Sequence, residues 1–348
     1  MDRKRLEEIL KKLKNVRMVV FGDFFLDSYQ IMDRKLSEMS IETCLEAFQV
    51  VAVRQQPGAA GTVVANLCSL GVNVLALGLT GDDGNGYVMR RKLEAMGVDL
   101  RGMVELPGYD TPTYTKPMMR ELDGYEHELN RMDIKHRVPL TREIEDFLIH
   151  QLHALLPEAD GMLIIDQVQE RNCGVITDRI RQEISQLALK YPDKIISADS
   201  REYLELFENV ILKSNVRESL RAAHMESSEG EAPAAAAERC ARVLTARTHR
   251  PVIITLGNNG LFLAERAGTP GCALPPIPVS GPIDIVGAGD SVNAAVGSAL
   301  CAGATLKEAG ILGNLAASVV IQQIGTTGCA TPQQLLAQFD AHPELIHL

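Results

Sequence analysis

Short apolar runs alternate with longer amphipathic stretches along most of this chain. The apolar runs predict strands at 18–22, 74–78, 162–166, 195–199, 210–213, 252–256 and 261–264. The amphipathic stretches predict helices at 61–70, 86–96, 141–155, 174–190, 234–246, 291–302 and 306–323. Strands that alternate with helices are typical of βαβ units. The pattern therefore predicts an α/β fold with a mostly parallel sheet and helices on both faces.

The predicted strands are apolar along their whole length, which favours burial on both faces of the sheet. Ligands of such sheets bind beyond the carboxyl ends of the strands. Asp23, Asp166 and Asp199 each lie at or just after such an end. We therefore expect these three carboxylates to line one crevice.

Two segments, 28–56 and 107–137, interrupt the alternation. Both are polar and rich in β-prone residues, and the second contains Asp123-Gly124, a dipeptide that favours a hairpin turn. Both segments also lie beside glycine-rich stretches. They predict a small β-sheet that acts as a lid, with two ordinary surface hairpins as the alternative.

The composition is that of a globular protein, with 46% of the 348 residues hydrophobic and 23% charged, and we expect one domain over 1–348. No apolar run is long enough for a transmembrane helix, and residues 1–15 predict an amphipathic helix rather than a signal peptide. The formal charge of −10 argues against a nucleic-acid partner. Seven cysteines without a Cys-x-x-Cys pair fit a reducing cytoplasm better than disulfides or a zinc ribbon.

Residues 284–290 carry the strongest signal for chemistry. Gly287, Ala288 and Gly289 are small enough for their backbone amides to approach a ligand, and a predicted helix begins directly after them. A helix N-terminus suits phosphate, and the carboxylate of Asp290 suits a base that takes a proton from an attacking hydroxyl. Together they indicate phosphoryl transfer, with an aspartate in the first turn of an ordinary helix as the alternative.

Three other turns have both a functional and a structural interpretation. Asn215 and Glu218 begin a helix after a strand, where Glu218 either completes a capping box or holds a water-coordinated Mg²⁺. The loop 255–260 joins two strands and either wraps a nucleotide or is a hairpin turn. The turn 57–62 precedes a helix, and its small residues allow a polar ligand to approach the backbone.

In this chain order, the motifs resemble those of the ribokinase-like (PfkB) carbohydrate kinases over residues 17–339. The resemblance implies a three-layer α/β/α fold with a mostly parallel sheet and a small β-sheet lid. It implies ATP and Mg²⁺ as cofactors, with K⁺ as a candidate monovalent cation. Asp290 is then the catalytic base, and Gly287, Ala288 and Gly289 form the anion hole.

The same resemblance assigns the remaining site residues. It places Glu218 beside Mg²⁺ through water, and Asp284 beside the monovalent cation, across from the segment 325–328. The residues expected to bind ATP are Asn215, Thr255, Gly257, Gly260 and Asn314. The residues expected to bind the acceptor are Asp27, Gly58, Ala59, Thr62, Lys116 and Arg131.

Within the family, the chain is most similar to the sugar kinase domain of bacterial heptose-7-phosphate kinase/adenylyltransferases. The segments that carry this likeness are 40–42, 57–58, 69–71, 78–81 and 131–133. No adenylyltransferase half is expected, because the chain ends at Leu348.

The chain also departs from the family pattern at four positions. Ala59 and Thr62 replace a glycine and an asparagine of the sugar motif, and Val286 replaces a threonine. Met118 stands near the lid lysine, Lys116, where the family often has a basic residue, which argues against a phosphorylated acceptor. We therefore expect intact kinase chemistry and leave the identity of the acceptor open.

The expected function is transfer of the γ-phosphoryl group of ATP to a hydroxyl of a sugar or sugar phosphate, with a homodimer through the lid as a candidate assembly. A nucleoside kinase of the same family would change the acceptor but not the mechanism. A binding or regulatory protein without turnover is favoured by the departures from the motif and disfavoured by Asp290 and Glu218. The chain lacks the glycine motif of an NAD-dependent oxidoreductase and that of a P-loop NTPase, which argues against both classes.

Overall fold

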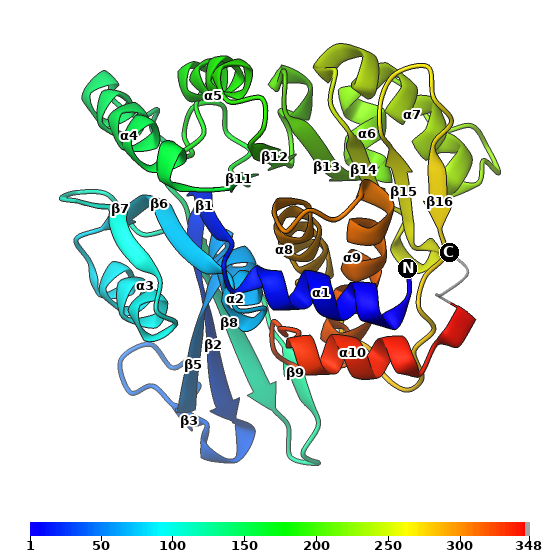
Figure 1. Ribbon diagram of the computed structural model, residues 1–348. Coiled ribbons are helices and arrows are strands. Elements are labelled where there is room, and N and C mark those ends of the chain that lie inside the picture. The colour runs from blue at the N-terminus through cyan, green and yellow to red at the C-terminus, as the bar shows by residue number, and fades with distance from the viewer. Residues whose placement is uncertain (345–348) are drawn as a thin grey trace.

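The computed structural model describes residues 1–344, and its centre is a nine-stranded sheet of order β16-β15-β14-β13-β12-β11-β1-β6-β7 (Figure 1). The strands are β1 (Arg17–Gly22), β6 (Asn73–Gly81), β7 (Asp99–Leu106), β11 (Gly161–Asp166), β12 (Ile195–Ser200), β13 (Ile211–Asn215), β14 (Val252–Thr255), β15 (Leu261–Ala264) and β16 (Cys272–Leu274). Only the pairs β14–β15 and β15–β16 are antiparallel. The carboxyl ends of the parallel strands therefore meet at one edge.

Helices cover both faces of this sheet, as the sequence predicts (Figure 1). One layer contains α1 (Arg3–Leu13), α2 (Ala60–Ser69), α3 (Gly84–Ala95), α8 (Ala288–Cys301), α9 (Leu306–Val320) and α10 (Pro332–Asp340). The other layer contains α4 (Arg142–Leu155), α5 (Asp178–Lys190), α6 (Val216–Ala222) and α7 (Pro233–Thr248). Successive side chains of β11 enter opposite cores, because Leu163 packs in the first layer and Ile164 in the second. Across residues 1–344, no helix combines the length and the apolar character that a membrane span requires.

The two segments that interrupt the alternation meet in a second sheet, of order β10-β8-β2-β5 (Figure 1). Its strands are β2 (Phe24–Asp33), β5 (Val50–Ala59), β8 (Thr113–Arg120), β9 (Glu126–Glu128), which pairs with β8, and β10 (Met132–Ile134). A two-stranded hairpin, β3 (Glu38–Met39) with β4 (Glu46–Ala47), lies between β2 and β5 along the chain. The hairpin turn predicted at Asp123-Gly124 is confirmed, since the Glu121 amide donates to the Tyr125 carbonyl at 2.8 Å.

Several predicted boundaries shift in the structure. The first segment of the second sheet begins at Phe24 and ends at Ala59, so it extends beyond 28–56 at both ends. The helix predicted at 174–190 begins at Asp178, where the Thr177 hydroxyl accepts from the Ile180 amide and caps α5. Strand β7 has no counterpart among the predicted strands. Short 3₁₀ turns occupy Arg34–Leu36, Leu156–Glu158, Leu204–Leu206 and Gly257–Asn259.

Candidate functional site

A cavity of about 650 Å³ lies at the carboxyl ends of β12, β13 and β14, beside the start of α8. Most residues that the sequence assigns to ATP, the metal and the reacting groups line it together. These residues are Asn215, Glu218, Thr255, Gly257, Gly260, Ala288, Gly289, Asp290 and Asn314. The cavity is therefore the place where a fold of this kind binds its ligands.

The first turn of α8 forms the floor of this cavity through Ala288, Gly289 and Asp290, and the turn at Gly287 directly precedes it. Gly287 has φ +81°, a conformation that glycine adopts without strain, and no side chain caps the helix. The Ala288 amide donates to the Ile285 carbonyl at 3.2 Å, outside the helix, and the amides that follow it open the first turn of α8. A Cβ built on Gly287 would lie 2.6 Å from the Thr327 methyl, so a larger residue does not fit. The geometry suits an anion at this turn.

Asp290 stands in the first turn of α8, partly exposed to the cavity. Burial raises the pKa of its carboxyl to about 7, with the nearby Lys213 ammonium opposing the shift and Asp199 adding to it. The Asp27 carboxylate, which does not line the cavity, also raises this pKa. A carboxyl with a pKa near 7 can accept a proton at neutral pH.

Lys213 is a functional candidate that sequence reasoning missed. Its ammonium is buried, lies 2.6 Å from the Asp199 carboxylate, and would be 3.2 Å from a Cβ built on Gly289. Burial disfavours its charge, but Asp199 and Asp290 outweigh that effect and raise its pKa. A lysine inside an otherwise apolar strand, two residues before Asn215, was the available signal.

The predicted capping box at the start of α6 is confirmed. Asn215 accepts from the Glu218 amide at 2.9 Å, and the Glu218 Oε2 accepts from the Asn215 amide at 2.8 Å. Burial, followed by the Asp199 carboxylate, raises the pKa of Glu218. Because the same side chain lines the cavity, the cap holds one carboxylate oxygen and leaves the other for a ligand.

The walls of the cavity differ in chemistry from its floor. The loop after β14 turns at Gly260, whose φ is +89° and whose Cβ would be 2.1 Å from the Leu274 carbonyl oxygen. The Asn314 side-chain amide donates to the Pro275 carbonyl at 2.8 Å and so fixes the opposite wall. Apolar side chains complete this part: Leu261, Ile277, Val279, Val292, Ala317 and Ile321. The walls therefore suit a planar apolar group.

The residues assigned to the acceptor lie outside this lining, at the base of the second sheet. The Asp27 carboxylate is buried 3.3 Å from the Lys116 ammonium, which also donates to the Tyr29 hydroxyl. A Cβ built on Gly58 would lie 3.0 Å from Asp27 Oδ2, so the turn lies directly against the carboxylate. Burial raises the pKa of Asp27, and Lys116 and Arg131 oppose that shift.

Three further residues assigned to the acceptor also have defined positions. Ala59 has φ +51° and ψ −116°, outside the regions that alanine prefers. The Thr62 side chain is buried at the Gly287 turn, where a Cβ built on Gly287 would be 3.6 Å from its methyl group. Arg131 pairs with Asp133 at 2.7 Å at the rim of the sheet.

Asp284 connects two loops rather than lining the cavity. Its Oδ1 accepts from the Val286 amide at 3.0 Å and its Oδ2 from the Gly325 amide at 3.2 Å. The segment 325–328 is thereby held against the turn at Gly287. This arrangement agrees with the prediction that the two loops face each other.

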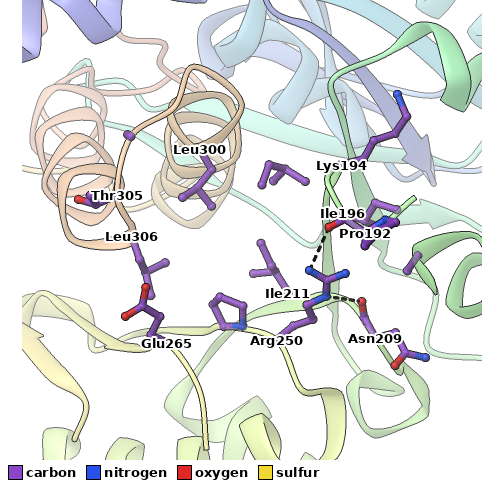
Figure 2. A pocket seen from close by; sticks show the side chains of 14 residues that line it. Pro192, Lys194, Ile196, Asn209, Ile211, Arg250, Glu265, Leu300, Thr305 and Leu306 are labelled. Atoms are coloured by element: carbon purple, nitrogen blue, oxygen red, sulfur yellow. Dashed lines mark hydrogen bonds between the residues drawn. The ribbon is translucent and has the colours of Figure 1, made fainter. Parts of the chain in front are cut away.

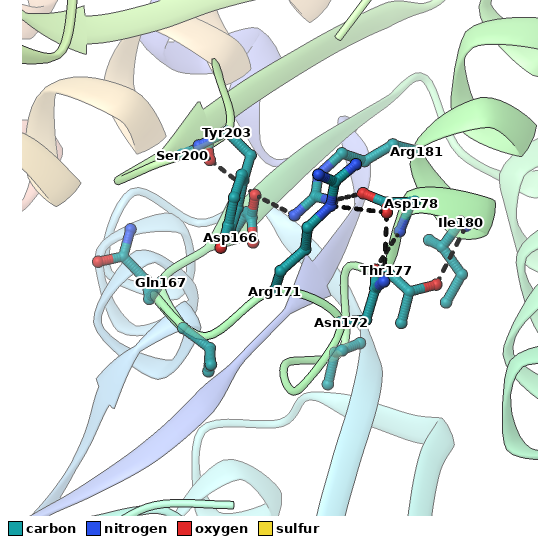
Figure 3. A network of polar contacts seen from close by, with 12 residues as sticks. Asp166, Gln167, Arg171, Asn172, Thr177, Asp178, Ile180, Arg181, Ser200 and Tyr203 are labelled. Atoms are coloured by element: carbon teal, nitrogen blue, oxygen red, sulfur yellow. Dashed lines mark hydrogen bonds and ion pairs between the residues drawn. The ribbon is translucent and has the colours of Figure 1, made fainter. Parts of the chain in front are cut away.

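The expectation that Asp23, Asp166 and Asp199 line one crevice is wrong for two of them. Asp199 lines the cavity, but the Asp23 carboxylate is buried and accepts three backbone amides of the β11–α5 loop, at 2.7–3.1 Å. Figure 3 shows Asp166 in a separate buried network, where Arg181 donates to it at 3.0 Å and Ser200 at 2.6 Å. Carboxylates at strand ends can thus be consumed by the fold itself.

A second, smaller cavity of about 250 Å³ lies at the opposite ends of the strands (Figure 2). Arg250 reaches into it and donates to the carbonyls of Asn209 and Pro192, both at 3.2 Å. None of the residues assigned from the sequence lines this cavity. The larger cavity is therefore the candidate active site.

Comparison with known proteins adds the following findings. A family model described as pfkB family carbohydrate kinase matches residues 26–334. The bifunctional protein HldE of Trichlorobacter lovleyi is 25% identical over 338 residues, which cover 97% of this chain and 65% of that protein. HldE of Desulfatibacillum aliphaticivorans is 27% identical, with coverage of 94% and 64%. The chain thus spans less than two thirds of the length of these relatives.

Solved structures share the fold. The ribokinase of Arabidopsis thaliana, complexed with ribose and ATP, has a TM-score of 0.67 at 19% identity and covers 93% of this chain and 98% of its own. Phosphofructokinase-2 from Escherichia coli, in complex with potassium, has a TM-score of 0.69 at 17% identity, with coverage of 94% and 98%. The predicted ribokinase-like α/β architecture is confirmed.

Proposed function

Because this chain belongs to the pfkB family of carbohydrate kinases, we propose that it transfers the γ-phosphoryl group of ATP to a hydroxyl of a sugar or sugar phosphate. The observation that carries the proposal is the position of Asp290, at the helix start that forms the floor of the large cavity. Its carboxyl group is close enough to Asp27 for the Asp27 charge to raise its pKa. An acceptor between these two carboxylates would meet a phosphoryl group bound at the Gly287 turn.

ATP would lie along the cavity, with its adenine against the apolar wall that includes Ile277, Val279 and Ile321. Its phosphates would reach the floor, where the amides of Gly287–Gly289 and the Lys213 ammonium offer hydrogen bonds and positive charge. Asn215, Thr255, Gly257, Gly260 and Asn314 line the path between the two ends. Lys213 also neutralises charge that develops on the transferred group.

In the proposed step, the acceptor hydroxyl oxygen forms a bond to the γ-phosphorus as the bond to the β–γ bridging oxygen breaks. The hydroxyl proton passes to Asp290, and ADP leaves with the bridging oxygen. The amides of the anion hole, Gly287–Gly289, hold the oxygens of the group in transfer. With a pKa of about 7, Asp290 is about half ionised at neutral pH and largely ionised only in alkaline solution.

The donor set fits the two cations that the family implies. Glu218 has one carboxylate oxygen outside its capping bond, and Mg²⁺ needs only one or two carboxylates because it keeps several waters and binds phosphates. Mg²⁺ would supply positive charge to the phosphates. The carboxylate of Asp284, between two loops, is a suitable oxygen ligand for a monovalent cation such as K⁺.

The acceptor would bind at the base of the second sheet, where Asp27 accepts hydrogen bonds from its hydroxyls. The Gly58–Ala59 turn and Thr62 would contact its ring, and Lys116 and Arg131 would complete the rim. The second sheet would then act as a lid on a single kinase domain, 1–348, with lid segments 28–56 and 107–137. Closure would exclude water from the reacting groups.

The outer part of this lid exposes several apolar side chains, and the most exposed of them is Ile41, with 98% of its area accessible. The others are Leu36, Met39, Leu45, Phe48, Val50, Val51 and Val53. Strand β5 lies at the edge of the sheet, so its outer backbone groups are available for pairing. We therefore propose a homodimer through the lid, since apolar patches of this kind mark interaction sites.

The deciding experiment is ADP release from ATP–Mg²⁺ across a panel of sugars, sugar phosphates and nucleosides. Turnover with a sugar or sugar phosphate, lost in Asp290→Asn, is the expected result. Turnover with nucleosides alone would identify a nucleoside kinase instead. Binding of ATP without turnover on any acceptor would point to a regulatory protein.

A further inference from the structure

Gln56 connects the acceptor strands to a loop near the other end of the chain. It lies in β5 directly opposite Asp27 of β2, so the two residues are register partners. Its Nε2 donates to the Thr327 hydroxyl at 2.6 Å, and its Oε1 accepts from the Thr326 hydroxyl at 3.3 Å. One side chain thus makes two hydrogen bonds to a segment about 270 positions away.

The loop that Gln56 holds also supports the proposed anion hole. A Cβ built on Gly287 would be 2.6 Å from the Thr327 methyl, so this methyl covers the turn. The Gly325 amide of the same loop donates to Asp284, three residues before Gly287. A displacement of this loop would therefore change the position of the turn that receives the phosphoryl group.

We propose that Gln56 is a positioning residue that holds the acceptor strands and the anion-hole turn at a fixed separation. This inference rests on the proposed kinase function and concerns the same site. The connection runs from Asp27 across the β2–β5 pairing to Gln56, and from there through Thr327 to Gly287. Gln56 touches neither substrate nor reacting atoms in this scheme. Its effect comes through the distance between them.

Distance is the quantity to which phosphoryl transfer is most sensitive here. The acceptor and phosphoryl group bind to different parts of the molecule, the second sheet and the main body. A misplacement of about 1 Å between reacting groups can lower a rate about 10²-fold. Gln56 is only partly buried, so close packing does not hold the lid against the loop once its hydrogen bonds are lost. Its loss should therefore lower kcat more than it alters ATP binding.

The test compares Gln56→Met with Gln55→Met, because neighbouring side chains of a strand point to opposite faces. Methionine keeps the length of glutamine and removes both hydrogen bonds. Thr327→Val removes the hydroxyl and keeps the methyl against Gly287. We expect Gln56→Met and Thr327→Val each to lower kcat by roughly 10- to 100-fold, with the KM for ATP within about twofold of the wild type. The double variant should be no slower than the slower single variant, since both remove one connection.

Several kinetic results would overturn the inference, and three of them concern kcat. They are a kcat of Gln56→Met within about twofold of wild type, an equal loss in Gln55→Met, or single-variant effects that multiply in the double variant. A rise in the acceptor KM with unchanged kcat would instead make Gln56 an acceptor contact, which also contradicts it.

Hydrogen exchange separates this inference from the proposed function. Gln56→Met should speed amide exchange in 284–290 and 325–328, and Gln55→Met should not, whether or not the wild type turns over an acceptor. Unchanged exchange in both segments overturns the inference on its own. A wild type that turns over no acceptor, yet shows the exchange effect, would contradict the kinase proposal and leave the connection established.

Discussion

The nucleotide side and the acceptor side of the proposed site are built in different ways. The nucleotide side uses the ends of neighbouring parallel strands and the first turns of α6 and α8, all within the main body. The acceptor side uses side chains from β2, β5 and β8, which meet only because distant segments pair in the second sheet. The first is fixed by the central sheet, and the second depends on the position of a lid.

The two sides also differ in backbone strain, which is lower on the nucleotide side than on the acceptor side. On the nucleotide side, the positive φ angles at Gly260 and Gly287 fall on glycines, which adopt them without strain. On the acceptor side, Ala59 has φ +51° and carries a side chain there. The nucleotide side of the proposed site thus places its positive-φ turns on glycines, and the acceptor side places one on an alanine.

The largest effect should come from removing the base on the nucleotide side. Asp290→Asn keeps the size of the side chain and removes its basicity, so turnover should fall by roughly 10²–10⁴-fold. ATP affinity, measured by calorimetric titration, should survive. Near-normal turnover in this variant would contradict the assignment of the base to the nucleotide side, because the acceptor side would then have to supply it.

The pH dependence of the same residue sharpens this test. The pKa of about 7 predicts that the wild-type kcat falls as pH drops below 7. The stability of the protein should change with pH in the opposite direction to kcat. The pKa of Asp290 in the folded state exceeds the ordinary value of 3.8, so the free energy of unfolding should fall as pH rises from 3.8 to about 7. Thermal melts should show that Asp290→Asn is spared this loss.

The second effect belongs to the acceptor side alone. Asp27→Ala should leave the acceptor hydroxyls unpaired, at about 1–3 kcal/mol for each, while ATP affinity stays almost unchanged. Asp33→Ala is a matched control, because Asp33 ends the same strand and only caps a 3₁₀ turn. Separate titrations with each ligand measure the difference. Equal losses for both ligands would indicate a folding defect, and an unchanged acceptor affinity would remove Asp27 from the site.

A smaller effect separates the two interpretations of Glu218. Glu218→Gln should raise the Mg²⁺ concentration for half-maximal rate by about tenfold if the carboxylate acts on the metal. Glu308→Gln is the control, since Glu308 completes an equivalent capping box with Thr305 on α9 and does not line the cavity. If both variants melt early and neither changes the Mg²⁺ requirement, Glu218 only caps its helix.

Local signals made the helix starts around the large cavity predictable from the sequence. The small residues before Asp290 and the pair Asn215 and Glu218 specify their turns and caps within a few positions. Non-local contacts were not predictable in the same way. The parallel pairing of β2 with β8, the Lys213–Asp199 pair and the Gln56–Thr327 contact all join segments that no local pattern connects.

The error on Asp23 and Asp166 has a related cause. A carboxylate after a strand has one sequence signature and two outcomes, because it can face a ligand or accept amides of a distant loop, here the β11–α5 loop. Asp23 accepts three such amides, and Asp166 pairs with Arg181. Which outcome occurs depends on how residues 167–181 pack against the carboxylate, and no local pattern of the sequence specifies that contact.

The smallest predicted effect concerns the strain at Ala59. Glycine at this position relieves a conformation that costs alanine about 1–3 kcal/mol, and the greater freedom of glycine in the unfolded chain offsets part of this gain. We expect Ala59→Gly to raise the free energy of unfolding by about 1 kcal/mol, measured by denaturant unfolding. His249→Gly is the matched control, because His249 has φ +56° and ψ 22° at the end of α7, an ordinary left-handed conformation. Its gain should be smaller, since that region is less strained for a side chain than the one at Ala59. If the two variants gain equally, Ala59 carries no special strain, and the contrast between a relaxed nucleotide side and a strained acceptor side does not hold.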